Sequence, residues 1–308
     1  MKTIKYLTFS LVIILFAGIL ASFLEKGSSV YSVYPDGNTK ALIMSYDDGT
    51  IDDIKLIRLF DENKIVGTFN LNSGLLGSTQ VWPQKNADTL VYKYLPKDSL
   101  LSIYKNHEIA AHSLTHKDFK NLKDDEILLE VETDIANLNR LTNRKILSMA
   151  YPFGNSNPHI AKLISNTGFT NARTVGDTYT FNLPDTFLLW RPTCHDSKAL
   201  GFLDSYLSIK SNKLTVFLVW GHSWEFKDEK RWSDFSKFCT EIGNRKDIWY
   251  VGCGEFIDYQ LTLKKLKITD GTIVNPKDNK EVWFKQDGLV KVLKPGDRIE
   301  AQINPVTK

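Results

Sequence analysis

Short apolar runs alternate with amphipathic segments along most of the chain. Lys40–Tyr46 and Val66–Asn72 are apolar runs followed by polar residues, which is the pattern of buried strands. Asp124–Thr142 places its apolar side chains on one helical stripe, so it is the clearest predicted helix. The remaining predicted strands are Glu108–His112, Leu147–Tyr151, Phe169–Arg173, Phe187–Trp190, Leu214–Trp220 and Ile248–Val251, and the remaining predicted helices are Ile51–Asn63, Pro158–Thr167, Lys198–Lys210, Arg231–Ile242 and Cys253–Leu263.

This alternation of strand and helix favours an α/β fold in which helices cover a parallel sheet, either open or closed as a barrel. In such folds, the polar residues that carry chemistry collect at the carboxyl ends of the strands. That rule nominates Asp47, Asp48, His112 and His222 by position. Beyond Leu261, short alternating segments are broken by Asp-Gly and Pro-Gly turns, which predicts a small β appendage at 262–308.

The first 21 residues have the pattern of a signal peptide. Lys2 and Lys5 precede an apolar run from Leu7 to Leu20, and Ala21 is a suitable cleavage position. The alternative is an uncleaved anchor, which would be the only association with a membrane. Both versions predict an exported protein (periplasmic, cell-surface or secreted), with residues 22–35 as a linker before a domain at 36–261.

The composition is that of a globular protein. Hydrophobic residues make up 42% of the chain and charged residues 24%, which excludes disordered, collagen-like and coiled-coil classes. The net charge of +3 is too balanced for a protein that grips a phosphate backbone, so no nucleic-acid partner is expected. The three cysteines are too few for a disulfide framework, and the sequence does not set the oligomeric state.

The segment His112-Ser-Leu-Thr-His116 is the sharpest local signal of chemistry. Two imidazoles four residues apart lie on one face of a helical turn, where they can share one metal ion. A zinc-protease motif needs a glutamate directly after the first histidine, and Ser113 at that position excludes this class. The alternative interpretation is two surface histidines that lie four residues apart by chance.

Asp47 and Asp48 directly follow a predicted buried strand. Adjacent carboxylates at the end of an apolar strand repel each other, and a cation or hydrogen-bond donors must compensate for that cost. One aspartate and two histidines would give a metal three ligands and leave positions for water and substrate, while the second aspartate could act as a base. The alternatives are an Asp-Gly turn with a helix cap or, for the same three ligands, a non-haem iron oxygenase site.

Four segments, taken in order, resemble the motifs of the polysaccharide deacetylases, carbohydrate esterase family four. They are Ser45-Tyr-Asp-Asp-Gly49, His112-Ser-Leu-Thr-His116, Ala150-Tyr-Pro-Phe-Gly154 and Val219-Trp-Gly-His222. Their joint order and spacing are far more specific than any single motif. The resemblance implies a divergent member of this family, with a distorted seven-stranded (β/α) barrel over the domain at 36–261 and the small C-terminal β appendage beyond it.

The resemblance also implies a role for each matched residue. Asp48, His112 and His116 would hold a divalent metal, which is usually zinc in this family. Asp47 would be the general base that deprotonates the metal-bound water. The resulting hydroxide would attack an acetyl carbonyl that the same metal polarises.

Two further catalytic roles follow from the same resemblance. The backbone N–H of Phe153 would help to stabilise the oxyanion, and His222 would be the general acid for the leaving amine or alkoxide. The aromatic residues that could offer flat faces to sugar rings around the cleft are Tyr151, Phe153, Trp220 and Trp224. The predicted substrate-binding residues are Tyr151, Trp220 and Arg173.

The chain departs from the family pattern in two places. The third-motif arginine, which usually pairs with the catalytic aspartate, is Ala150 here. Arg173 or Arg191 could reach the same place, and Arg173 is preferred because it ends the strand expected beside the third motif. The fourth motif, which tunes the catalytic histidine, has no clear match, although His195 and Asp196 stand in that region.

The resemblance therefore predicts a metal-dependent hydrolase that removes N- or O-linked acetyl groups from a polysaccharide or oligosaccharide. The expected partner is an acetylated glycan. The alternative is a catalytically impaired glycan-binding protein on the same scaffold, which the missing arginine at Ala150 motivates.

Overall fold

The computed structural model describes residues 30–82 and 90–301 of the chain, so the predicted signal peptide at 1–21 lies outside the described residues. The chain divides into two compact units. One unit is Thr39–Asp258, and the other combines Met1–Asn38 with Tyr259–Lys308. Within the described ranges, no helix is both long and apolar enough to cross a membrane.

A parallel sheet forms the centre of the larger unit. Its central strand, β2 (Lys40–Asp48), is buried along its whole length, as expected of a near-continuous apolar run covered on both faces. All the pairings in this sheet are parallel. The strand order is β6 (Glu108–Ala111), β3 (Gly67–Leu71), β2, β8 (Thr215–His222) and β7 (Cys194–His195), and β9 (Ile248–Tyr250) also pairs with β2.

Single parallel bridges carry the sheet beyond β6. They join Ala111 to Met149, Ala150 to Arg173, and Arg173 to Trp190, which lies just before β7 in the chain. The hydrogen-bonded path therefore curls back toward the other edge of the sheet, and the predicted distorted (β/α) barrel is confirmed.

The barrel has fewer regular strands than the sequence predicts. Leu147–Tyr151 and Phe169–Arg173 take part only through single bridges, and Phe187–Leu189 is a 3-10 turn rather than a strand. Pro152 lacks an N–H and begins a turn directly after the first of these segments, so a longer ladder cannot form there.

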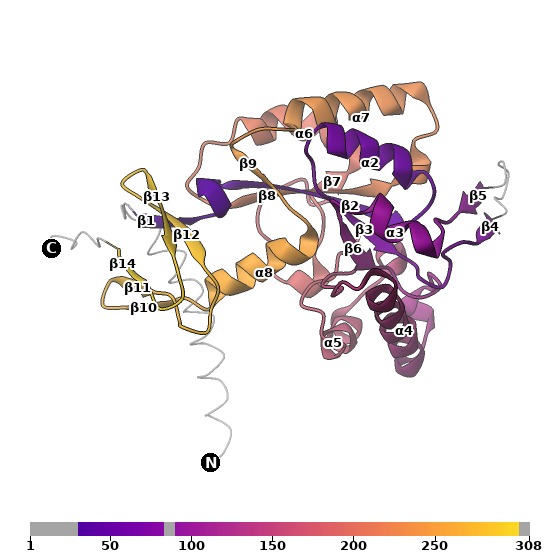
Figure 1. The fold of residues 1–308 in the computed structure, drawn as a ribbon, viewed down its shortest axis with the longest axis horizontal. Helices are drawn as coiled ribbons and strands as arrows, with labels where there is room; N and C mark the ends of the chain where they lie inside the picture. Colours follow the sequence, from indigo (N-terminus) through magenta and orange to yellow (C-terminus); the bar gives the residue numbers. More distant parts are fainter. Residues whose placement is uncertain (1–29, 83–89, 302–308) are drawn as a thin grey trace, which may run out of the picture. The chain divides into compact units, whose positions relative to one another are not determined.

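Helices flank the curled sheet, with α2, α6 and α7 on one side and α4 and α5 on the other (Figure 1). Helix α4 spans Asp124–Thr142, as predicted, and its buried residues lie on the apolar stripe. The other helices of this unit are α2 (Asp53–Glu62), α3 (Leu100–Ile103), α5 (Pro158–Asn166), α6 (Asp196–Leu207) and α7 (Glu229–Ile242), and α8 (Cys253–Lys264) begins in it.

The alternation along β2 places polar side chains inside the barrel. The ring of Tyr46 packs against Phe60 of α2 and Phe235 of α7, so it points toward the helices. Its neighbours Ser45 and Asp47 therefore point to the opposite face, into the barrel. This alternation positions the carboxylate of Asp47 at the carboxyl end of the sheet.

An antiparallel hairpin that the sequence analysis did not predict follows β3. Strands β4 (Thr79–Trp82) and β5 (Leu90–Lys93) form it, and residues 83–89 between them lie outside the described part of the chain. The backbone of Tyr94 bridges Thr50, and the N–H of Ile51 donates to the carbonyl of Lys93. These bonds hold the hairpin beside the end of β2.

The smaller unit consists of two three-stranded antiparallel sheets around an apolar cluster that includes Val30, Ile273 and Phe284. Val30–Val33 lies in the stretch that the sequence analysis treated as a linker, but it forms β1 because Val30 and Val33 are fully buried. The strand orders are β1–β12 (Val282–Gln286)–β13 (Leu289–Leu293) and β10 (Lys267–Thr269)–β11 (Thr272–Val274)–β14 (Arg298–Glu300).

Glu108 links the amino-terminal ends of the strands to α8. Its buried carboxylate accepts hydrogen bonds from Thr68 Oγ1 (2.7 Å), Ser148 Oγ (2.5 Å) and the backbone N–H of Gly254 (3.0 Å). Negative charge is favourable at the N-terminus of a helix. A Cβ atom at Gly254 would lie 2.5 Å from Glu108 Oε1, so only glycine leaves room for this carboxylate.

Replacement of Glu108 by alanine is expected to destabilise the protein by about 3 kcal/mol, because three buried donors lose their acceptor. Urea denaturation followed by circular dichroism measures the free energy of unfolding. Glu62→Ala, at an exposed position of α2, is the matched control and should stay within about 0.5 kcal/mol of wild type. Equal stability of the two variants would contradict the role assigned to Glu108.

Candidate active site

The two adjacent aspartates at the end of β2 diverge. Asp47 continues the strand and points into the barrel, whereas Asp48 has a left-handed backbone with φ of 83°. Aspartate is one of the few residues that tolerate this conformation. Gly49 follows with φ of 71°, and a Cβ there would lie 2.7 Å from Leu71 Cδ2. The turn therefore sends the two carboxylates in different directions.

The histidines of the second motif meet through an irregular loop, not through the helical turn that their spacing predicts. Ser113 and His116 have left-handed backbones, with φ of 66° and 59°. Asn72 donates to the carbonyls of His112 (2.5 Å) and Ser113 (2.9 Å), which fixes the loop. The imidazole centroids of His112 and His116 lie 4.8 Å apart.

Carboxylates from α4 hold the same loop from outside. Glu130 accepts hydrogen bonds from the N–H of Thr115 (2.8 Å) and from its hydroxyl (2.7 Å). Asp134 accepts from the backbone N–H of His112 at 3.1 Å. These bonds compensate for the strain of two left-handed residues in one short segment.

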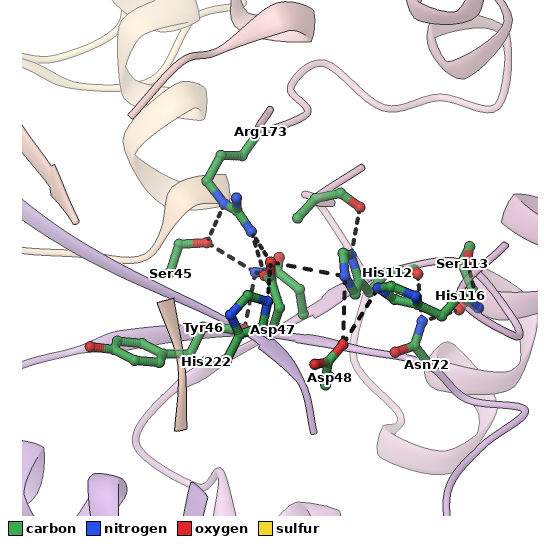
Figure 2. A network of polar contacts seen from close by, with 12 residues as sticks. Ser45, Tyr46, Asp47, Asp48, Asn72, His112, Ser113, His116, Arg173 and His222 are labelled. Carbon is green, nitrogen blue, oxygen red and sulfur yellow. Dashed lines mark hydrogen bonds and ion pairs between the residues drawn. The ribbon is translucent and has the colours of Figure 1, made fainter. Parts of the chain in front are cut away.

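Asp48, His112 and His116 converge as the sequence predicts. The Nε2 atoms of His112 and His116 lie 3.8 and 3.6 Å from Oδ1 of Asp48. Metal–ligand bonds of about 2.0–2.2 Å in a tetrahedral site separate the ligand atoms by about 3.4 Å. Both histidine–aspartate distances are therefore within a few tenths of an ångström of that separation, and all three donor atoms lie within 4.8 Å of one another, so they could hold a small divalent ion (Figure 2).

The hydrogen bonding and burial of the two imidazoles suit this role. Nδ1 of His112 lies 2.8 Å from the carbonyl oxygen of Ala150, which can only accept, so Nδ1 is the donor and Nε2 is the nitrogen that faces Asp48. Burial, together with the neighbouring His112, lowers the pKa of His116 to about 4. The ring of His116 is therefore neutral near pH 7, as a metal ligand must be.

Both carboxylate oxygens of Asp47 accept hydrogen bonds from other residues. Nη2 of Arg173 contacts both carboxylate oxygens of Asp47, at 2.5 Å for Oδ2, and Asn70 Nδ2 donates to Oδ1 at 2.9 Å. Burial alone would raise the pKa of Asp47, but the guanidinium of Arg173, assisted by His112 and His222, lowers it to about 2. Asp47 is thus an ionised carboxylate beside Asp48, His112 and His116, which we call the metal-type donors.

The structure answers which arginine takes the place left by Ala150. Arg173 lies between Asp47 and Ser45, with its Nε 3.0 Å from Ser45 Oγ, and it is only 2% exposed. Arg191 instead donates to the backbone carbonyls of Gly176 and Asp177. Arg173 therefore takes this place, but it is a buried partner of Asp47 and is not among the residues that line the cavity, so its predicted role in substrate binding is not supported.

His222 ends β8, the strand that pairs with β2, and it lies beside Asp47 in that pairing. Its Nε2 lies 4.0 Å from Asp47 Oδ2, and its Nδ1 lies 2.9 Å from Glu225 Oε1. Burial alone would lower the pKa of His222, but the hydrogen bond to Glu225 and the charges of Asp48 and Asp47 raise it to about 9. The ring is therefore protonated at neutral pH and able to donate a proton.

A charged network backs His222, and the sequence analysis missed its central member, Glu225. Glu225 Oε2 lies 3.2 Å from His195 Nε2 and 2.6 Å from Arg231 Nη2. His195, His222 and Glu225 have metal-ligand spacing, but the guanidinium of Arg231 already supplies the cation beside this carboxylate. Asp196 is buried and accepts from Tyr46 and Arg231, so it supports the network and does not line the cleft.

A cavity of about 360 Å³ opens over the metal-type donors. Phe153 has a left-handed backbone (φ 57°), is 50% exposed, and places its ring 4.5 Å from that of His116. Trp220 also lines the cavity, with its Nε1 bonded to Asp177 at 3.1 Å. The aromatic lining residues are Tyr92, Tyr94, Phe153, Trp220 and Trp224.

Tyr151, which the sequence analysis assigned to substrate binding, does not line this cavity. The residue is 1% exposed, its hydroxyl donates to the carbonyl of Leu188, and its ring packs against Phe119. In an extended segment neighbouring side chains point to opposite faces, and the side chain of Tyr151 faces the helical layer. The prediction for Tyr151 is therefore wrong.

Comparison with known proteins finds the same family. Residues 35–172 match the family model described as polysaccharide deacetylase. A putative polysaccharide deacetylase from Mycobacterium smegmatis has the same fold, with a TM-score of 0.52 and 17% identity over 76% of this chain and 94% of that chain. No curated protein sequence matches the chain.

Two other solved structures are similar at lower scores. The deacetylase PplD of Streptococcus pyogenes, in complex with acetate, has a TM-score of 0.37 and 17% identity over 43% of this chain and 55% of that chain. A Bacillus anthracis pseudoenzyme of carbohydrate esterase family four, BA3943, has a TM-score of 0.43 and 15% identity over 72% of this chain and 66% of that chain. The match thus spans about half the length of the streptococcal deacetylase.

The family match covers the strands and loops that carry Asp47, Asp48, His112 and His116. The fold shared with the mycobacterial protein extends over most of the larger unit and beyond the end of the family match. On these two findings, residues 35–172, somewhat less than half of the chain, are similar to the polysaccharide deacetylase family, and the fold is the one shared with the mycobacterial protein, consistent with a divergent member.

Proposed function

We propose that the protein is a metal-dependent hydrolase that removes N- or O-linked acetyl groups from a polysaccharide or oligosaccharide. One observation carries the proposal: a His–His–carboxylate donor set lies between an ionised aspartate and a protonated histidine in one cavity. Such an arrangement can bind a Lewis acid, accept a proton on one side and donate one on the other. Zinc suits this donor set of two imidazoles and one carboxylate.

Asp48, His112 and His116 would hold the metal, which when bound supplies Lewis acidity to an acyl carbonyl and to a water molecule. Asp47 accepts the proton of the attacking water, and Arg173 keeps its carboxylate ionised and oriented for this task. His222 donates a proton to the departing amine or alkoxide, and Glu225 fixes its ring. The backbone N–H of Phe153 is our candidate donor to the developing oxyanion.

The cavity fits a sugar-bearing substrate. Aromatic rings from Phe153 and Trp220 flank the metal-type donors, and flat apolar faces of this kind suit the C–H faces of sugar rings. We therefore propose Trp220 and Phe153 as sugar-contacting residues, in place of Tyr151. The N-terminal sequence further supports the proposal that the protein acts outside the cytoplasm, where polymeric glycans lie.

The competing hypothesis of an impaired glycan-binding protein rested on Ala150 in place of an arginine. The ion pair between Arg173 and Asp47 removes that reason, because the aspartate keeps a guanidinium partner from another segment. The enzyme hypothesis is therefore preferred, and the experiment below separates the two.

The purified protein is expected to release acetate from chitooligosaccharides and acetylated xylan. A chelator should stop this release, and added zinc should restore it. Asp47→Asn should keep the metal and lose activity by at least about 100-fold, because the base is neutralised. Asp48→Ala should lose the metal itself. An acetate assay with elemental analysis measures both. Bound metal without acetate release from any acetylated glycan would favour the glycan-binding protein.

Arg173→Gln is expected to move the acid limb of kcat/KM to higher pH. Asp47 has a lowered pKa, about 2, so it stays ionised well into acid; without the guanidinium the opposing effect of burial prevails and its pKa rises. Protonation then removes the base at a higher pH than in wild type. The measurement is the pH dependence of acetate release between pH 4 and about pH 8. Arg191→Gln is the matched control, and an identical acid limb in both variants would contradict the role of Arg173.

A further inference from the structure

The two oxygens of Asp48 have different partners. Oδ1 faces the Nε2 atoms of His112 and His116. Oδ2 accepts a hydrogen bond of 2.7 Å from the indole Nε1–H of Trp224. Asp48 is only 7% exposed, so water has little access to replace this donor. The indole N–H therefore has the position of a specific partner for the carboxylate oxygen that does not face the histidines.

Trp224 is held firmly where it can make this bond. It lies in the 3-10 turn Ser223–Glu225, which directly follows β8, and its ring lines the cavity. The ring stands edge-on to Tyr92, with centroids 4.9 Å apart, and lies 4.8 Å from the ring of His222. The contacts on both sides limit how far the indole can turn away from Asp48.

We propose that Trp224 is a positioning residue that reserves Oδ2 of Asp48, so that this aspartate offers a single oxygen to the metal. The inference rests on the proposed function, because it concerns the same metal site. A carboxylate free at both oxygens can bind a metal through one or both of them. A charge-assisted hydrogen bond to one oxygen favours the one-oxygen mode and leaves metal positions open for water and the acyl oxygen.

The neighbouring carboxylate shows the same principle in a stronger form. Asp47 has both oxygens bound by Arg173 and one also by Asn70, so it keeps out of the donor set although it adjoins Asp48. The two aspartates thus differ in how many of their oxygens accept hydrogen bonds: both oxygens of Asp47 do, whereas at Asp48 only Oδ2 does and Oδ1 faces the histidines.

The chain provides a matched control in Trp220. This second tryptophan also lines the cavity, but its Nε1–H donates to Asp177, which is not among the metal-type donors. Exchanging either tryptophan for phenylalanine removes an indole from the cavity wall. Only the exchange at position 224 removes a hydrogen bond from a predicted metal ligand.

The test measures zinc affinity of the full chain by competition with a chromophoric chelator. Trp224→Phe is expected to weaken zinc binding roughly 10- to 100-fold, as loss of a hydrogen bond to a metal ligand usually does, whereas Trp220→Phe should change it less than about threefold. The metal-free Tm of both variants should change equally little.

Two further measurements isolate the N–H itself. Benzothienylalanine incorporated at position 224 keeps the ring shape but has sulfur in place of the N–H, and it should weaken zinc binding as Trp224→Phe does. In the cobalt(II)-substituted protein, both changes should alter the visible absorption bands, which report coordination number, while Trp220→Phe leaves them unchanged.

Unchanged zinc affinity and cobalt spectrum with benzothienylalanine would overturn the inference, and equal losses in the two phenylalanine variants would do so as well. In either case wild-type metal binding and acetate release would still support the proposed function. A wild-type protein that binds no divalent metal would overturn both.

Discussion

The buried ion pair between Asp47 and Arg173 is the interaction on which the site depends. Two like unit charges 4 Å apart repel by about 4 kcal/mol in surroundings of intermediate dielectric constant, and burial adds its own cost to each charge. The guanidinium cancels the charge of one aspartate and occupies both its oxygens. Asp48 can therefore lie next to it and turn its Oδ1 toward the histidines.

The backbone conformation around the site helps to direct Asp47 and Asp48 toward different partners. Asp48, Ser113 and His116 all have left-handed backbones, a conformation that costs a non-glycine residue of the order of 1–3 kcal/mol. Hydrogen bonds from Asn72 and to Glu130 hold the histidine loop in place. The strain is concentrated where three donor atoms must meet, which is where a preorganised metal site would need it.

Much of this arrangement could be predicted from the sequence. The apolar run of β2 and the stripe of α4 fix the two elements that bear or support the donors, and the four motifs fix which side chains carry them. The carboxyl ends of adjacent parallel strands bring Asp48 and His112 together although they are far apart in the chain. Position and residue type therefore nominated both aspartates and both histidines, and the resemblance to the family assigned Asp48 to the metal and Asp47 to the base.

The predictions that were wrong or missing concern where side chains point and which distant segments meet. Tyr151 follows the bridged residue Ala150 by one position, and a single step along an extended segment turns a side chain from the cavity to the opposite face. Glu225 and Trp224 lie in a 3-10 turn whose path no hydrophobic pattern encodes, so their bonds to His222 and Asp48 could not be foreseen. Val30–Val33 pairs with a strand some 250 residues later, beyond the reach of local periodicity.

The exchange of the third-motif arginine has a simple structural reason. Ala150 and Arg173 are partners in one parallel bridge, so their side chains project from the same face of the sheet, into the barrel. An arginine on either segment can direct its guanidinium toward the end of β2, and the small side chain of Ala150 leaves space for one from its neighbour. The carbonyl of Ala150 meanwhile orients His112, so position 150 keeps a task that needs no side chain. Because the two short segments are bridged, the arginine can lie in either segment of the sequence and still place its guanidinium at the same position in the site.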